Sequence, residues 1–200
     1  MSDVVTVSGS SAYSGPLPMV REVAEDRGLT VTSVVFDGDA ADEYTACRET
    51  VRTRVEEDAP AVVAGFSAGA HLALDLVQAA PSLFPADAVV LAFDPPAVMQ
   101  IDGGTSEVSP VEPVEPGVAA IYPSVRDPGD RVDGACRVRE VQYEEFQYSD
   151  DAPSDEEYSR MDRAHRFKDR DAAVRRIVED EVDWVSPHQV TDGTPAHPGQ

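Results

Sequence analysis

The sequence predicts a three-layer α/β fold in which a mostly parallel sheet of about six strands is covered by helices on both faces. Two observations lead to this prediction. Valine-rich apolar runs recur along the chain, and most are followed by a segment whose apolar residues have helical spacing. The runs are also apolar at nearly every position, which is typical of parallel strands that helices cover on both sides. A length of 200 residues suits one domain with a sizeable core.

The first two strand–helix units follow each other closely. Residues 3–8 (DVVTVS) predict the first strand, and residues 18–27 predict a helix that ends at Gly28. Residues 30–36 (TVTSVVF) predict the second strand. Residues 41–57 predict the second helix, because their apolar side chains recur with helical spacing between charged ones.

The next units are also rich in valine. Residues 59–65 and 87–93 predict the third and fourth strands, with a helix at 68–80 between them. Residues 117–123 (GVAAIYP) and 136–143 (CRVREVQY) predict the fifth and sixth strands.

A last helix is predicted at residues 169–185, so a single domain is expected over residues 1–185. Residues 95–116 contain Gly103-Gly104 and evenly spaced prolines, which predict an extended surface loop. Residues 147–162 are expected to form an acidic insertion, and residues 186–200 a flexible C-terminal tail.

The charge of the chain limits its partners. Thirty-eight acidic residues against 16 basic ones give a net charge of −22. Such a chain repels phosphate and anionic lipid, so we expect no nucleic-acid or membrane partner, and a small molecule as the ligand. Concentrated salt screens this self-repulsion, so we interpret the acidity as that of a halophilic protein. The sequence lacks a long apolar run and a signal-peptide pattern, and a cytoplasmic location is expected.

One short motif carries the chemistry. Ser67 lies in the pentapeptide Gly65-Phe66-Ser67-Ala68-Gly69, between a predicted strand and a predicted helix. That context is typical of a nucleophile elbow, in which a strained turn holds a serine hydroxyl at the carboxyl end of a sheet. The alternative is a tight corner in a Rossmann-like binding module.

The whole chain resembles the compact α/β-hydrolases, most of all the small dienelactone-hydrolase-like and esterase members. The similarity runs from DVVTVSGSS through GFSAGAHLAL and IYPSVRDPGDRV to AHRFKDRDAAVRRIVEDEVDWV, and the elbow is its specific part. The resemblance implies an α/β-hydrolase-like fold and a triad in the order nucleophile, acid, histidine. Dienelactone hydrolases proper have a cysteine nucleophile, so Ser67 favours ordinary ester chemistry.

A serine needs a histidine base, and the chain contains four histidines. The resemblance assigns the base to His165, which lies just before the predicted last helix. His71, one turn beyond the nucleophile on the same helix, is interpreted as a packing or hydrogen-bonding residue. His188 and His197 fall in the predicted tail.

The same resemblance assigns the acid to Asp127, in the turn after the predicted fifth strand. Asp94, at the end of the fourth strand, and Asp130 remain alternatives. The backbone N–H groups of Ala68 and of Ser10 (or Gly9) are expected to form the oxyanion hole.

The sequence therefore predicts a carboxylesterase-like serine hydrolase that cleaves an ester or related acyl bond of a small soluble substrate. No metal and no organic cofactor is expected, and the two cysteines, Cys47 and Cys136, lack the spacing of a zinc site. The alternatives are a thioesterase, acyltransferase or peptidase with the same triad, or a non-catalytic binding protein on the same fold.

Overall fold

The structure is a computed structural model. It describes residues 2–9, 14–36, 40–85, 87–101, 104–108, 125–126, 136–141 and 163–189, with backbone alone for 40–42, 125–126, 163–170 and 186–189.

Six strands form the main sheet, in the order β2-β1-β3-β4-β8-β7. Their bounds are β1 (Val4–Ser8), β2 (Val31–Val35), β3 (Val62–Phe66), β4 (Val89–Phe93), β7 (Val125–Arg126) and β8 (Arg137–Val141). The first five in this order are parallel, and β7 pairs with β8 in the antiparallel direction. The carboxyl ends of five strands therefore meet at one edge, where open α/β sheets bind their ligands.

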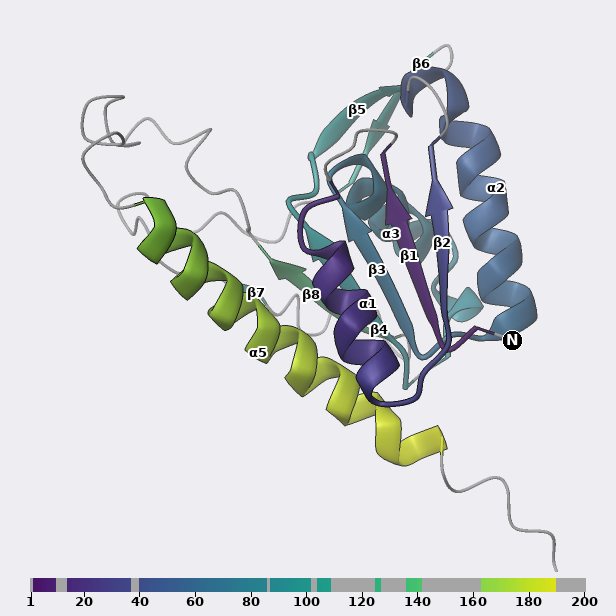
Figure 1. Ribbon diagram of the computed structural model, residues 1–200. Helices are drawn as coiled ribbons and strands as arrows, with labels where there is room; N and C mark the ends of the chain where they lie inside the picture. Colours follow the sequence, from purple (N-terminus) through teal and green to yellow (C-terminus); the bar gives the residue numbers. More distant parts are fainter. Residues whose placement is uncertain are drawn as a thin grey trace, which may run out of the picture.

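Helices cover both faces of this sheet, as predicted (Figure 1). Helices α1 (Leu17–Asp26) and α5 (Arg163–Gln189) lie on one face, and α2 (Ala40–Asp58) and α3 (Ala68–Ala79) lie on the other. A short 3₁₀ helix, η1 (Pro81–Leu83), follows α3.

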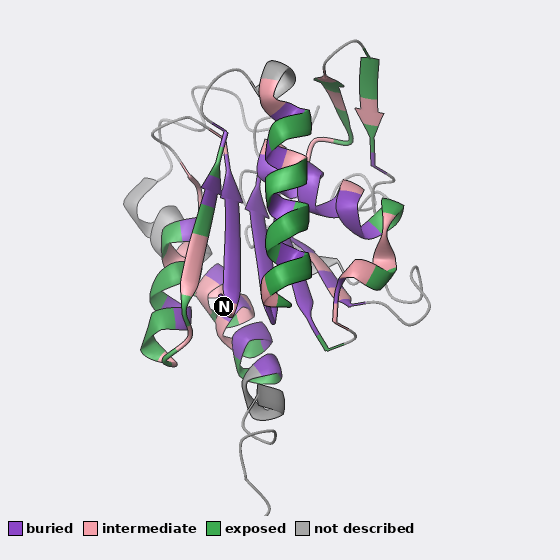
Figure 2. Cartoon of the chain, turned by 90° about the vertical axis from the view of Figure 1, so that its right-hand side faces the viewer, coloured by how far each residue is buried: buried purple, intermediate pink, exposed green. Residues whose placement is uncertain are grey.

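The strands send alternate side chains into two apolar cores. In β3, Val62 and Ala64 pack toward α1 and α5, whereas Val63 packs toward α2 and α3. Figure 2 shows the central strands buried along their length and the outer face of α2 exposed. Each fully buried valine contributes about 1.5–3 kcal/mol relative to an exposed one, so the two cores fix the register of the sheet.

Two ion pairs join α5 to α1 across the chain. Arg27 donates from Nε to Asp183 at 2.5 Å, and Arg175 donates to Glu22 at 3.0 Å. Being partly exposed, such pairs contribute about 0–1 kcal/mol each, so the apolar contacts of the two helices provide most of the attachment.

Most predicted elements are confirmed with shifts of a few residues at their ends. Helix α5 is longer than the predicted 169–185, since it begins at Arg163 and continues to Gln189. The predicted strand at 117–123, the insertion at 147–162 and residues 190–200 of the predicted tail lie outside the described residues.

The prediction of an extended surface loop over residues 95–116 is wrong for its first half. An antiparallel hairpin forms there from β5 (Val98–Ile101) and β6 (Gly104–Glu107). Met99 and Ile101 pack against the core beside α2 and α3, while Val98 and Gln100 point away from it. This alternation of buried and exposed side chains makes the segment a strand rather than a loop.

None of the helices in the described part of the chain combines the length and the apolar character that crossing a membrane requires.

Candidate active site

Ser67 occupies a strained turn between β3 and α3. Its backbone has φ 52° and ψ −119°, a region that side-chain-bearing residues rarely adopt and that costs about 1–3 kcal/mol. The residue is exposed and stands at the N-cap of α3, but its hydroxyl makes no capping hydrogen bond to the helix. The hydroxyl is therefore presented to solvent at the carboxyl edge of the sheet.

Both glycines of the motif are required by close backbone contacts. A Cβ atom on Gly65 would overlap the carbonyl oxygen of Gly69, and a Cβ on Gly69 would overlap the carbonyl oxygen of Val7 in β1. Since backbone atoms cannot yield as a flexible side chain does, any larger residue would push α3 away from the sheet. The glycines thus seat the start of α3 directly on β3 and β1.

The start of α3 supplies N–H donors next to the Ser67 hydroxyl. The first intrahelical bond runs from the N–H of His71 to the carbonyl of Ser67 at 3.0 Å. The N–H groups of Ala68, Gly69 and Ala70 precede it, and helix geometry gives such groups no intrahelical partner. They lie at the positive end of the helix dipole and suit a developing negative charge.

The loop after β1 lies next to the start of α3, because Gly69 contacts Val7. This loop contains Gly9 and Ser10, the two residues predicted to supply the second N–H donor of the oxyanion hole. Gly9 lies in the described part of the chain, where a Cβ atom would meet open space, and Ser10 lies outside it.

Asp94 follows β4 at the same edge of the sheet. Phe66 and Phe93 are register partners, so Ser67 and Asp94 are the next residues of two adjacent strands. Asp94 also has a positive φ, of 49°, and its N–H donates to the carbonyl of Val141 at 3.0 Å. The structure therefore brings Asp94, the alternative for the predicted acid, next to Ser67, the predicted nucleophile.

Asp127 and His165, the other two residues predicted for the triad, are less fully described. Asp127 lies outside the described residues, directly after β7, whose antiparallel direction takes the chain at Arg126 away from the carboxyl edge. His165 lies in the first turn of α5 rather than before the helix, and its backbone alone is described.

His71 is fully buried, and its ring makes two hydrogen bonds away from Ser67. Nδ1 contacts the carbonyl of Pro96 at 2.6 Å, and Nε2 contacts the hydroxyl of Ser106 at 2.8 Å. Its interpretation as a hydrogen-bonding residue is confirmed.

Sequence reasoning missed the two partners of His71, Pro96 and Ser106, because it placed them in a loop. The signal that could have found them was the alternation Met99-Gln100-Ile101 followed by Asp102-Gly103-Gly104, a pattern typical of a hairpin turn.

Within the described ranges, no three His, Cys, Asp or Glu side chains gather as a metal site requires. Comparison of the chain with protein-family models, with curated proteins and with solved structures gave no match.

Proposed function

We propose that this protein is a serine hydrolase of α/β-hydrolase type that cleaves an ester or related acyl bond of a small soluble substrate. The observation that supports it most is the conformation of Ser67. A strained turn, two glycines that permit it and an uncapped, exposed hydroxyl together have little purpose in a purely structural corner. They are the properties of a nucleophile held out toward a substrate.

In the proposed reaction, the Oγ of Ser67 attacks the carbonyl carbon while His165 accepts the hydroxyl proton. The C–O bond to the leaving group then breaks, and the same histidine returns the proton to the leaving oxygen. Water hydrolyses the acyl-enzyme by the same steps. The N–H of Ala68, with that of Ser10 or Gly9, donates to the oxyanion.

Two carboxylates compete for the role of the acid. Asp94 is beside Ser67, because the two residues follow adjacent strands whose backbones lie about 4.8 Å apart. Asp127, which the resemblance assigns, stays the first choice, and Asp94 is the alternative.

Labelling with a fluorophosphonate probe at molar salt tests the proposal. Wild type is expected to label, Ser67→Ala to lose labelling completely, and His165→Ala to label at least about a hundredfold more slowly. Circular dichroism at the same salt concentration confirms that each variant is folded. A folded wild type that does not label would contradict the hydrolase proposal and favour a non-catalytic binding protein. Labelling that survives in Ser67→Ala would show that another residue is the nucleophile.

A further inference from the structure

The polar cluster that the proposed reaction leaves unused is centred on His71. It comprises His71, Ser106, Tyr44, Asp75 and Arg48, from α3, β6 and α2. A buried imidazole is costly unless both ring nitrogens have partners, and here both do.

The two partners of the ring stand at the two ends of the β5–β6 hairpin. Pro96 lies two residues before β5, and Ser106 lies within β6. The hairpin is closed at its base by a bond from the N–H of Val108 to the carbonyl of Ala97 at 2.9 Å. One side chain of α3 thus bonds both to the segment just before β5 and to β6.

The partners also assign the protons on the ring. A carbonyl only accepts, so Nδ1 of His71 donates to Pro96. In the neutral ring Nε2 is then an acceptor, and the hydroxyl of Ser106 donates to it. The geometry assigns His71 to the Nδ1–H form, which is the less common form of a free histidine in water.

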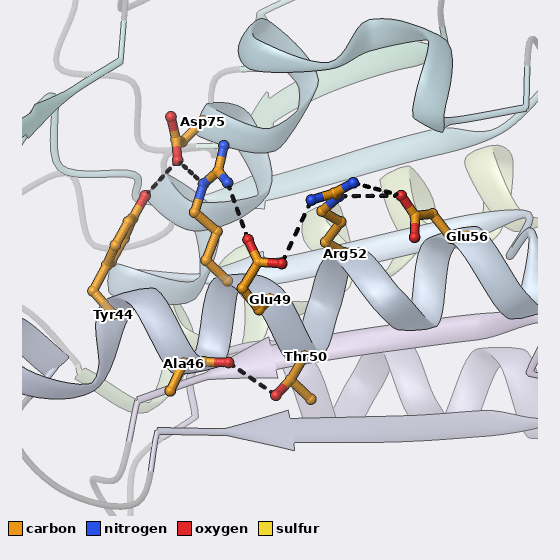
Figure 3. A network of polar contacts seen from close by, with 8 residues as sticks. Tyr44, Ala46, Glu49, Thr50, Arg52, Glu56 and Asp75 are labelled. Atoms are coloured by element: carbon orange, nitrogen blue, oxygen red, sulfur yellow. Dashed lines mark hydrogen bonds and ion pairs between the residues drawn. The ribbon is translucent and has the colours of Figure 1, made fainter.

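A second layer of contacts holds this arrangement against α2. The ring of Tyr44 meets that of His71 edge-on, with centroids 6.0 Å apart, and its hydroxyl donates to Asp75 at 2.9 Å. Figure 3 shows Tyr44 of α2 directed at Asp75 of α3. Burial raises the pKa of Tyr44, so the phenol keeps the proton that it donates. Arg48 binds the same oxygen of Asp75 at 2.6 Å.

His71 is also part of the nucleophile turn. Its backbone N–H donates to the carbonyl of Ser67, and Pro96 is only two residues from Asp94. The hairpin extends past the carboxyl edge of the sheet on the side that α2 and α3 cover (Figures 1 and 2). The same residue therefore contacts the Ser67 turn through its backbone and the hairpin through its ring.

We propose that His71 is a positioning residue, which holds the β5–β6 hairpin at a fixed place beside Ser67 so that the hairpin forms one wall of the substrate site. This inference rests on the proposed hydrolase function. It predicts that the hairpin affects substrate binding more than the chemical step, because the proposed reaction gives no hairpin residue a part in proton transfer or bond breaking.

The first test is a spectroscopic one that needs no activity. In the ¹⁵N-labelled wild type at neutral pH, long-range proton–nitrogen correlation is expected to show His71 protonated at Nδ1 and unprotonated at Nε2. The Nε2–H form would overturn the assigned arrangement, because Nδ1 could not then donate to the carbonyl of Pro96.

The second test compares Ser106→Ala with Ser82→Ala, a matched control in η1 whose side chain is exposed and lies outside the hairpin. With p-nitrophenyl butyrate as substrate, Ser106→Ala is expected to raise KM about threefold to tenfold, the effect of one lost hydrogen bond, with kcat nearly unchanged. Ser106→Thr, which keeps the hydroxyl, is expected to restore KM. Ser82→Ala should match wild type.

The outcomes separate the two proposals. If wild type labels but Ser106→Ala has a normal KM while its hairpin amides exchange faster, the hairpin is held by His71 without shaping the site, and the positioning role is wrong. If folded wild type does not label at all, the proposed hydrolase function is wrong. The proposal that the hairpin forms a wall of the substrate site is then wrong as well. The nitrogen spectrum still tests the bond from Nδ1 of His71 to Pro96, independently of any activity.

Discussion

Ser67 and Asp94 leave adjacent parallel strands side by side, and both do so through a positive φ, of 52° and 49°. The N–H of Ser67 donates to the carbonyl of Phe93, the residue before Asp94, at 2.9 Å. The carboxyl edge therefore places a carboxylate next to the proposed nucleophile, whether or not that carboxylate is the acid of the triad.

Asparagine variants distinguish the two acids. Asp127→Asn is expected to lower kcat about 10³–10⁴-fold, because the base loses the group that holds its tautomer. Asp94→Asn keeps the shape and tolerates positive φ, so we expect a loss of about tenfold or less. Hydrolysis of p-nitrophenyl acetate measures both. The reverse order of effects would transfer the role of the acid to Asp94.

Strain at Ser67 predicts that the proposed nucleophile lowers stability. Ser67→Gly is expected to raise the free energy of unfolding by about 1 kcal/mol, because glycine adopts this turn without a Cβ clash. Ser67→Ala keeps the Cβ atom, so its free energy of unfolding should not rise. Ala59, which ends α2 at φ 46°, is the control, and Ala59→Gly should stabilise similarly without affecting labelling. Urea unfolding at constant salt gives the comparison; a Ser67→Gly variant less stable than Ser67→Ala would refute the strain.

Close packing at Gly69 predicts a large cost for one methyl group. Gly69→Ala is expected to destabilise the protein by about 1–3 kcal/mol or more, since α3 must move off β1. Gly104→Ala is the matched control, because a Cβ there meets open space and its cost should stay within about 0.5 kcal/mol. Equal melting temperatures for the two variants would mean that α3 is not seated on the backbone of β1.

The thiols are expected to be unreactive in the folded protein. Burial raises the pKa of Cys47 and of Cys136 to about 11, from an ordinary 9.0. At pH 8 we expect slow reaction with Ellman's reagent in the native state and fast reaction after unfolding in guanidinium. Because the folded pKa is raised, the stabilising effect of the neutral thiols is complete below about pH 9 and falls as pH rises toward 11. Rapid native reaction of either thiol would contradict its burial.

Salt is expected to stabilise the fold. A net charge of −22 repels itself within the compact state, and molar salt shortens the screening length to about 3 Å. The melting temperature should therefore rise steeply between about 0.1 M and 2 M KCl. A melting temperature independent of KCl would remove the halophilic interpretation.

The sequence predicted the parallel strands and helices well because their signals are local. Valine runs and helical stripes such as Tyr44, Cys47, Val51 and Val55 determine each element without reference to its neighbours. The order of the strands, by contrast, depends on which strand each crossover returns to. That choice is made by packing over the whole sheet, so no single segment reveals it.

The turn at Ser67 was predictable to a similar extent. The glycines around Ser67 predicted a tight turn. The structure shows why they are needed, because Gly65 lies against the backbone of Gly69 and Gly69 lies against the backbone of Val7. The hydrogen bonds of His71 were not predictable, because they join α3 to a hairpin that sequence reasoning treated as a loop. A polar contact between distant segments becomes visible only when both are placed.

The position of the hairpin between two strands also determines how easily this segment can be replaced by another. The hairpin follows β4, which ends at Phe93, and precedes β7, which begins at Val125 and rejoins the sheet beside β8. The entropy of closing a loop between fixed ends grows only with the logarithm of its length, about 0.6 kcal/mol for each doubling. The closure entropy therefore allows segments of very different lengths to be exchanged between β4 and β7. Grafting other hairpins there offers a route to altered substrate preference that leaves the strands and the Ser67 turn untouched.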